Sequence, residues 1–112
     1  MTTYVDTSVI VSFFVLDDRA TKARAWAASG ARVVLSDWTL TEFTAALSHQ
    51  VRLGDLTDPE RAAAETAFDR WKSRLVVLEV GRDRFDEARG LMRAHPRLRA
   101  ADALHLAIAM SS

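Results

Sequence analysis

The sequence predicts an α/β protein whose short parallel sheet is covered by helices on both faces. Short apolar segments at residues 3–5, 32–35 and 75–79 have the length and the β-branched content of buried strands. Longer segments of helical character separate them, and parallel strands need crossover connections of this kind. The resulting order, β-α-α-β-α-α-β-α-α, favours right-handed crossovers and a sheet between two layers of helices.

The helices expected in the first half of the chain differ in character. Residues 9–16 form a continuous apolar run that fits either a strand or a buried helix, and we interpret it as a helix. Residues 19–29 alternate basic with Ala or Trp positions, as a surface helix does, and Gly30 suits its C-terminal cap. The next helix is expected over 39–53, where Gly54 stops it.

Helix signals are clearer in the second half of the chain. A helix over 58–74 is expected to begin with Asp58 at the cap and Pro59 in the first turn, because both residues favour a helix start. Residues 81–94 have apolar side chains at helical spacing, which predicts an amphipathic helix. Residues 99–110 form the last expected helix.

Length and composition fit one small globular domain over residues 1–112. The chain has 15 basic and 15 acidic residues, so we do not expect a surface that is basic all over and binds nucleic acid nonspecifically. Any contact with nucleic acid has to be a local basic patch. The absence of cysteine excludes disulfides and thiolate metal sites. The N-terminus lacks the basic start of a signal peptide, and the longest apolar run is too short to cross a membrane. We therefore expect a cytoplasmic protein with no membrane contact.

Three acidic residues lie where the expected helices begin, which is the edge of an open α/β sheet that binds ligands. Each acid also has a local explanation. Asp6 would cap the helix that starts at Thr7. Glu42 would complete a capping box with Thr39, and Asp102 would meet the positive end of a helix dipole.

Taken together, the acids predict a metal site. Asp6 and Asp102 are flanked by apolar residues that we expect in the core, where an anion is unfavourable unless it is paired. No Lys or Arg adjoins Asp6, so a shared divalent cation is the expected partner. A set of oxygen ligands without thiolates suits Mg²⁺ or Mn²⁺.

Three segments resemble the main motifs of a known family. Tyr-Val-Asp-Thr-Ser-Val-Ile-Val at 4–11, Thr-Glu-Phe at 41–43 and Arg-Ala-Ala-Asp-Ala-Leu-His-Leu-Ala-Ile-Ala at 99–109 are similar to those of PIN-domain ribonucleases. The resemblance is strongest to VapC-type toxins of type II toxin–antitoxin systems, and it covers essentially the whole chain. It implies a PIN-like (Rossmann-like) α/β/α sandwich and Mg²⁺- or Mn²⁺-dependent endonucleolytic cleavage of RNA. It also implies frequent homodimers and a cognate antitoxin that lies across the active-site groove.

The resemblance assigns the catalytic metal ligands by their positions in the motifs: Asp6, Glu42 and Asp102. Ser8, in preference to Thr7, would be a supporting hydroxyl near the metal. The implied reaction is hydrolysis of an RNA phosphodiester by water activated by one or two ions. Arg97 and Arg99, just before Asp102, are the best candidates for contacts with RNA phosphates.

Other conspicuous side chains are given structural roles. His105, one turn after Asp102, is expected to pack between helices and is left out of the catalytic set. The arginines of residues 82–93 are expected on a solvated helix face, in ion pairs such as Asp86 with Arg89. Trp38 is expected to touch a partner protein.

The sequence departs from the family's pattern after residue 110. Members continue into a further strand with a Thr and a fourth Asp, and then a helix, whereas this sequence ends at Ser112. We therefore expect a sheet that lacks the usual C-terminal strand and helix, with the edge of its first strand covered by another chain or a dimer mate. The alternative to a nuclease is a PIN-like binding module of low or no activity that works mainly through a partner.

Overall fold

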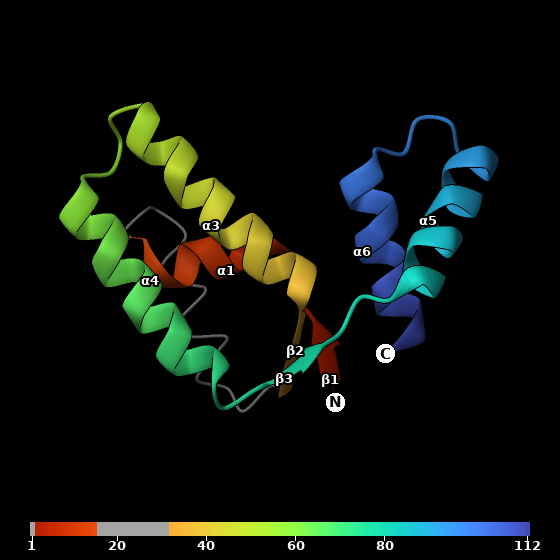
Figure 1. The fold of residues 1–112 in the computed structure, drawn as a ribbon, viewed down its shortest axis with the longest axis horizontal. Coiled ribbons are helices and arrows are strands. Elements are labelled where there is room, and N and C mark those ends of the chain that lie inside the picture. Colours follow the sequence, from red (N-terminus) through yellow and green to blue (C-terminus); the bar gives the residue numbers. More distant parts are fainter. Residues whose placement is uncertain (1, 16–31) are drawn as a thin grey trace.

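The predicted strands form one parallel sheet. The computed structural model describes residues 2–15 and 32–112. Its strands are β1 (Thr2–Tyr4), β2 (Arg32–Ser36) and β3 (Val76–Leu78). They lie in the order β1-β2-β3, with Thr3 opposite Val33. Figure 1 shows the three strands between α1, α3 and α4 on one side and α5 with α6 on the other. The predicted parallel pairing is confirmed, and each strand lies within a residue or two of its predicted segment.

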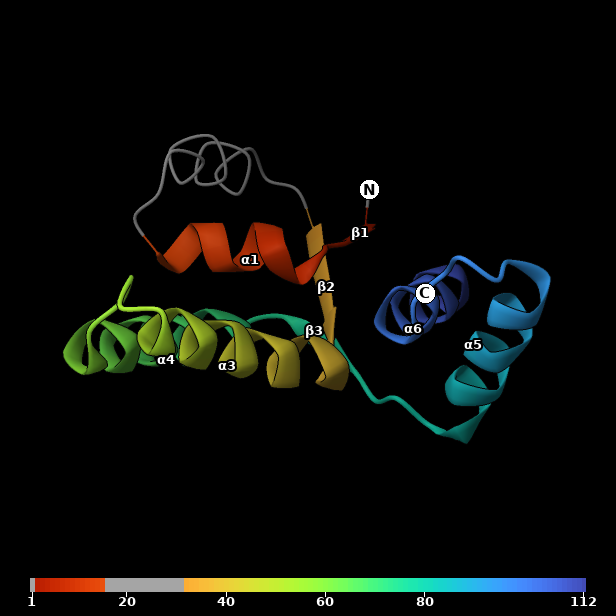
Figure 2. The same ribbon diagram turned by 90° about the horizontal axis from the view of Figure 1, so that it is seen from above.

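Helices cover both faces of this sheet. Those of the described residues are α1 (Thr7–Phe14), α3 (Asp37–Arg52), α4 (Asp58–Lys72), α5 (Arg82–Ala94) and α6 (Ala100–Ser111). Figure 2 shows α1, α3 and α4 on one side of the sheet and α5 with α6 on the other, which confirms the predicted α/β/α sandwich. The apolar run at 9–16 is helical as far as Phe14, whereas the helix predicted over 19–29 and its cap at Gly30 lie outside the described residues. None of the described helices is long and apolar enough to cross a membrane.

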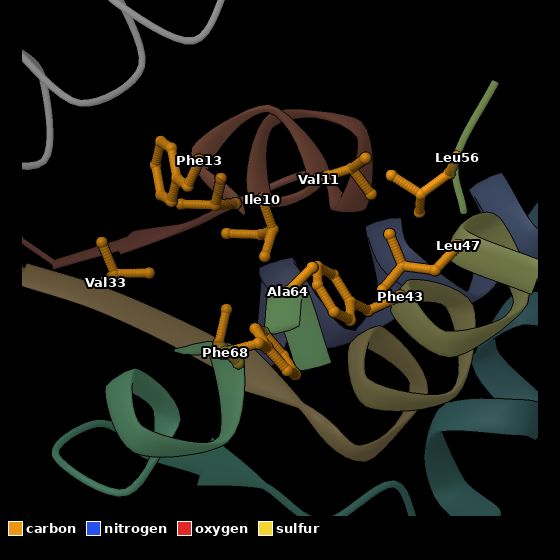
Figure 3. Packing of buried hydrophobic residues seen from close by; sticks show 11 residues of the cluster. Ile10, Val11, Phe13, Val33, Phe43, Leu47, Leu56, Ala64 and Phe68 are labelled. Atoms are coloured by element: carbon orange, nitrogen blue, oxygen red, sulfur yellow. The ribbon is translucent and has the colours of Figure 1, made fainter. Parts of the chain in front are cut away.

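Large side chains fill the space between the sheet and α1, α3 and α4 (Figure 3). We call this group the aromatic cluster: Val5, Ile10, Val11, Phe13, Val33, Leu35, Phe43, Leu47, Leu56, Ala64 and Phe68. Phe43 and Phe68 stack with ring centroids 4.0 Å apart, and Trp71 meets Phe13 edge-on at 5.4 Å. Burial of such rings removes much apolar surface from water, so this cluster is the main source of stability.

Small side chains dominate the opposite face, where α5 and α6 pack. We call this group the alanine cluster: Ala88, Ala103, Leu104, Ala107 and Ile108. Tyr4 of β1 and Leu78 of β3 pack against it. Because side chains alternate along a strand, these residues face α6 while Val33 and Leu35 of β2 face the aromatic cluster.

The structure corrects two predicted helix starts. Ser36, at the extended end of β2, caps α3 and forms a capping box with Thr39, so the predicted box of Thr39 with Glu42 is wrong. Ser36 is the N-cap residue because it has the extended backbone angles that a cap requires, whereas Thr39 already lies within the helix. Likewise Thr57, and not Asp58, caps α4. Glu42 therefore lies in the second turn of α3.

β1 lies at one edge of the described sheet. The expectation that another chain covers this edge remains a prediction.

Candidate functional site

Asp6 lies between β1 and α1 and caps that helix. Its side chain accepts hydrogen bonds from the Ser8 amide at 3.4 Å and from Ser8 Oγ at 3.0 Å. The predicted cap is confirmed, and Ser8 is the hydroxyl that supports this carboxylate. The Asp6 side chain is exposed, so the carboxylate remains open to a ligand.

Glu42 is held from two sides. Its Oε1 atom accepts a hydrogen bond from Thr7 Oγ1 at 2.7 Å and forms a second hydrogen bond with Nε2 of His105. The Glu42 side chain is 25% exposed and that of His105 is 17% exposed. The hydroxyl that contacts Glu42 is therefore that of Thr7, while Ser8 serves Asp6.

His105 continues this chain of hydrogen bonds into the sheet. Its Nδ1 atom is 2.6 Å from the hydroxyl of Tyr4. That hydroxyl is in turn 2.8 Å from Ser36 Oγ and 3.3 Å from Thr39 Oγ1. The role given to His105 from the sequence, helix packing, was therefore incomplete. The one available signal was its position one helical turn after Asp102.

Asp6 and Asp102 line the same concave region, which has a volume of about 290 Å³. We call it the carboxylate hollow, and its residues are Tyr4, Asp6, Asp102, His105, Leu106 and Ala109. Asp102 lies in the first turn of α6, as predicted, and its side chain is exposed like that of Asp6. The expectation that these two carboxylates are buried was wrong, because residues at these helix starts face solvent at the sheet edge.

The donors of this region fit a hard divalent cation. Within the described residues, no group of three or more His, Cys, Asp or Glu side chains surrounds one point closely enough to hold a metal. Asp6 and Asp102 nevertheless provide two exposed carboxylates at one hollow, and Glu42 is linked to it through His105. Mg²⁺ is commonly held by one or two carboxylates and keeps several waters, so the donor type and number suit Mg²⁺ or Mn²⁺.

Arginines lie close in sequence to Asp102. Arg99 is the N-cap residue of α6, and Arg97 precedes it in an exposed turn. Neither takes part in an ion pair with another described residue, whereas Arg89 pairs with Asp86 at 3.7 Å, as predicted. No acidic side chain of residues 2–15 or 32–112 therefore neutralises Arg97 or Arg99.

Trp38 lines a second hollow of about 230 Å³ between α5 and α6, with Phe85, Met92 and Leu104 among its neighbours. Its Nε1 atom is buried and has no hydrogen-bond partner among the described residues. A buried indole N–H normally finds an acceptor, so this group is unusual. The expected contact of Trp38 with a partner remains a prediction.

Comparisons with known proteins agree with this fold. The model of the PIN domain family matches residues 3–112, so the chain belongs to the PIN-domain family. Among solved structures, it is similar to Mycobacterium tuberculosis VapC20, described as a toxin that cleaves the sarcin-ricin loop. The two share 25% sequence identity with a TM-score of 0.74, over 99% of this chain and 82% of that chain. No curated protein sequence matches the chain. The predicted VapC-type PIN fold is thus confirmed.

Proposed function

We propose that this chain is a metal-dependent endoribonuclease and the toxin of a toxin–antitoxin pair. The observation that carries the proposal is the placement of Asp6 and Asp102 at one hollow of a PIN-domain fold. These residues are far apart in sequence and come together only through the packing of α6 against β1. Similarity to a VapC toxin that cleaves RNA supports the same conclusion.

In the proposed mechanism, Asp6 and Asp102, together with Glu42, would hold Mg²⁺ or Mn²⁺. When bound, the cation would supply the chemistry that lowers the pKa of a water molecule and stabilises negative charge on the phosphoryl group. The chain's own residues orient the reactants. Ser8 holds Asp6 in place, and one of the carboxylates accepts a proton from the attacking water.

RNA is bound, in this proposal, by basic residues that are close in sequence to Asp102. Arg97 and Arg99 attract the phosphates of RNA, and their guanidinium groups match phosphate geometry. The proposal also includes a cognate antitoxin, a homodimer, one domain over residues 1–112 and a cytoplasmic site of action. None of the described ion pairs would have to break for Arg97 or Arg99 to bind RNA.

The decisive experiment compares RNA cleavage by the parent chain, Asp6→Asn and Asp58→Asn, each freed of any partner, in Mg²⁺ and in Mn²⁺. Asn caps a helix about as well as Asp, so Asp6→Asn removes the charge and keeps α1 capped. We expect cleavage to fall by roughly 100-fold or more, because loss of a ligand removes several kcal/mol of transition-state stabilisation. Asp58→Asn, an exposed Asp at the start of α4, is the matched control and should leave cleavage unchanged.

The same experiment decides between the nuclease and the binding module. The separation of Glu42 from a three-carboxylate group favours the binding module, since it leaves two carboxylates at the hollow. A parent chain that binds a partner protein but cleaves no RNA with either metal would support that alternative. Cleavage that persists in Asp6→Asn would overturn the assignment of the hollow as the active site.

A further inference from the structure

We propose that His105 and Tyr4 are positioning residues that fix one oxygen of Glu42 so that its other oxygen is presented to the cation. The proposal rests on the nuclease function given above. It is carried by a continuous chain of side-chain hydrogen bonds from Glu42 through His105 to Tyr4 and on to Ser36. The general chemistry of the family does not require a histidine, so the role of His105 is a separate question.

The directions of these hydrogen bonds follow from the groups involved. An ionised carboxylate only accepts, so Nε2 of His105 donates to Glu42 Oε1. In the neutral imidazole Nδ1 is then an acceptor, and the Tyr4 hydroxyl donates to it. The Tyr4 oxygen in turn accepts from the hydroxyl of Ser36. Every member of the chain thus has a donor or acceptor that matches its neighbour.

Both ring nitrogens of His105 are occupied by protein groups. A histidine that exchanges a proton with RNA needs one nitrogen free to face the reacting atoms. Although His105 lines the carboxylate hollow, Nε2 is bonded to Glu42 and Nδ1 to Tyr4. The geometry therefore favours a positioning role over a role as general acid or base.

The two oxygens of Glu42 are used differently. Oε1 accepts from Thr7 Oγ1 and from His105 Nε2, which occupies the lone pairs of that atom. No hydrogen bond to Oε2 is present within residues 2–15 and 32–112. Because Glu42 is also tied to the backbone of α3, fixing Oε1 limits the directions in which Oε2 can point. Oε2 is therefore the atom available to a cation.

The hydrogen-bond chain joins β1 and α6, which line the hollow, to α3 and α1, which do not. Tyr4 belongs to β1, Glu42 to α3 and His105 to α6, and Thr7 begins α1. The alanine cluster holds α6 against the sheet only by apolar packing, which has no direction. The hydrogen bonds are directional, so they fix the position of Glu42 relative to α6, the helix that carries Asp102.

The test measures Mn²⁺ affinity directly, by the electron paramagnetic resonance signal of free Mn²⁺, in the purified full chain without RNA. His105→Leu and His105→Gln are matched in size, but only Gln keeps an N–H donor for Glu42. We expect His105→Leu to raise the Kd for Mn²⁺ by about 10–100-fold, as loss of partners to metal ligands commonly does. The Kd of His105→Gln should stay within about threefold of the parent value, and the Kd of Tyr4→Phe should lie between those of the two His105 variants. His95→Gln, at the exposed end of α5, is the control.

A merely structural histidine would give a different pattern. Equal Mn²⁺ affinity in the parent and in His105→Leu would overturn the proposal, and so would an equal loss in the Leu and Gln variants. If His105→Leu does not fold, Tyr4→Phe decides alone, since it removes one hydroxyl, and an unchanged Kd would overturn the proposal. Asp6→Asn distinguishes failure of the proposed function from failure of this inference. If Asp6→Asn also leaves Mn²⁺ binding intact, the proposed function itself fails. If only the His105 variants leave it intact, the function stands and this inference falls.

Discussion

The two faces of the sheet are filled by different kinds of side chain. The aromatic cluster joins α1, α3 and α4 through rings such as Phe43 and Phe68, which stack at 4.0 Å. The alanine cluster joins α5 to α6, and three of its five buried residues, Ala88, Ala103 and Ala107, have small side chains. One face therefore buries much more apolar surface for each residue than the other.

Because of this difference, we expect one cluster to determine the stability of the protein and the other to determine the geometry of the site. Large rings give a large gain on burial, and removal of one leaves a cavity that the fold does not close. Small side chains contribute less, but Tyr4 of β1 packs against the alanine cluster. Asp102 and His105 lie on α6, so the distance between the acids depends on the alanine cluster. We expect the aromatic cluster to control unfolding and the alanine cluster to control metal binding.

The largest expected effect is that of Phe43→Ala on stability. Phe43 is fully buried and stacked on Phe68, so its truncation should cost about 3–5 kcal/mol of the free energy of unfolding. Urea denaturation of the parent and the variant measures this loss. Phe85→Ala, in which the ring is 48% exposed, is the matched control and should cost less than about 1 kcal/mol. Similar losses in both variants would contradict the assignment of stability to the aromatic cluster.

A smaller change in stability, with a larger change in metal binding, is expected for Ala107→Leu. Ala107 is 1% exposed, so the added carbons have to displace α6 from the residues that pack against it, at a cost of about 1–3 kcal/mol. Because α6 carries Asp102, the Kd for Mn²⁺ should rise more than in a Phe43 variant of equal stability. Ala94→Leu, at the exposed end of α5, is the control. An unchanged Kd for Mn²⁺ in Ala107→Leu would show that the position of α6 does not limit the site.

The smallest expected effect lies outside both clusters, at the start of α4. The hydrogen bond from the Thr57 amide, with a further one from the Thr57 side chain, holds the pKa of Glu60 below its ordinary value. A lowered pKa in the folded state adds stability at neutral pH, and this part is lost as the pH falls through the pKa of the folded protein. Glu60→Gln keeps the capping box but does not titrate. Below pH about 4, the parent should therefore lose stability relative to Glu60→Gln. Thermal unfolding of both proteins over a range of pH measures this difference. A pH-independent difference would exclude this contribution.

Much of the fold was predictable because the strands and helices have strong local signals. The parallel order followed from apolar segments too far apart for hairpins, and the ambiguous run at 9–16 proved helical as far as Phe14. The start of α3 was not predictable, since Ser36 with Thr39 and Thr39 with Glu42 are overlapping capping patterns. Only the end of β2 decides between them, and that is a tertiary property.

The site was predictable in part. Placing Asp6 and Asp102 at one edge required only the rule for parallel sheets, and both residues line one hollow. Their exposure was not predictable, because apolar neighbours in sequence say little about a side chain at a helix start. His105 was missed because its partners, Glu42 and Tyr4, are more than 60 positions away along the chain. No local pattern marks such a contact.

The parallel sheet also sets the order in which this protein can assemble. Each strand pair joins residues about 30 or more positions apart, such as Thr3 with Val33 and Val34 with Val76, and contacts of this range form slowly. α5 and α6, in contrast, are neighbours in sequence and can meet early. During synthesis the N-terminal elements emerge first. The carboxylate hollow needs β1 and α6 together, so a growing chain that has made only its first two strands does not yet have the site that we propose for RNA cleavage.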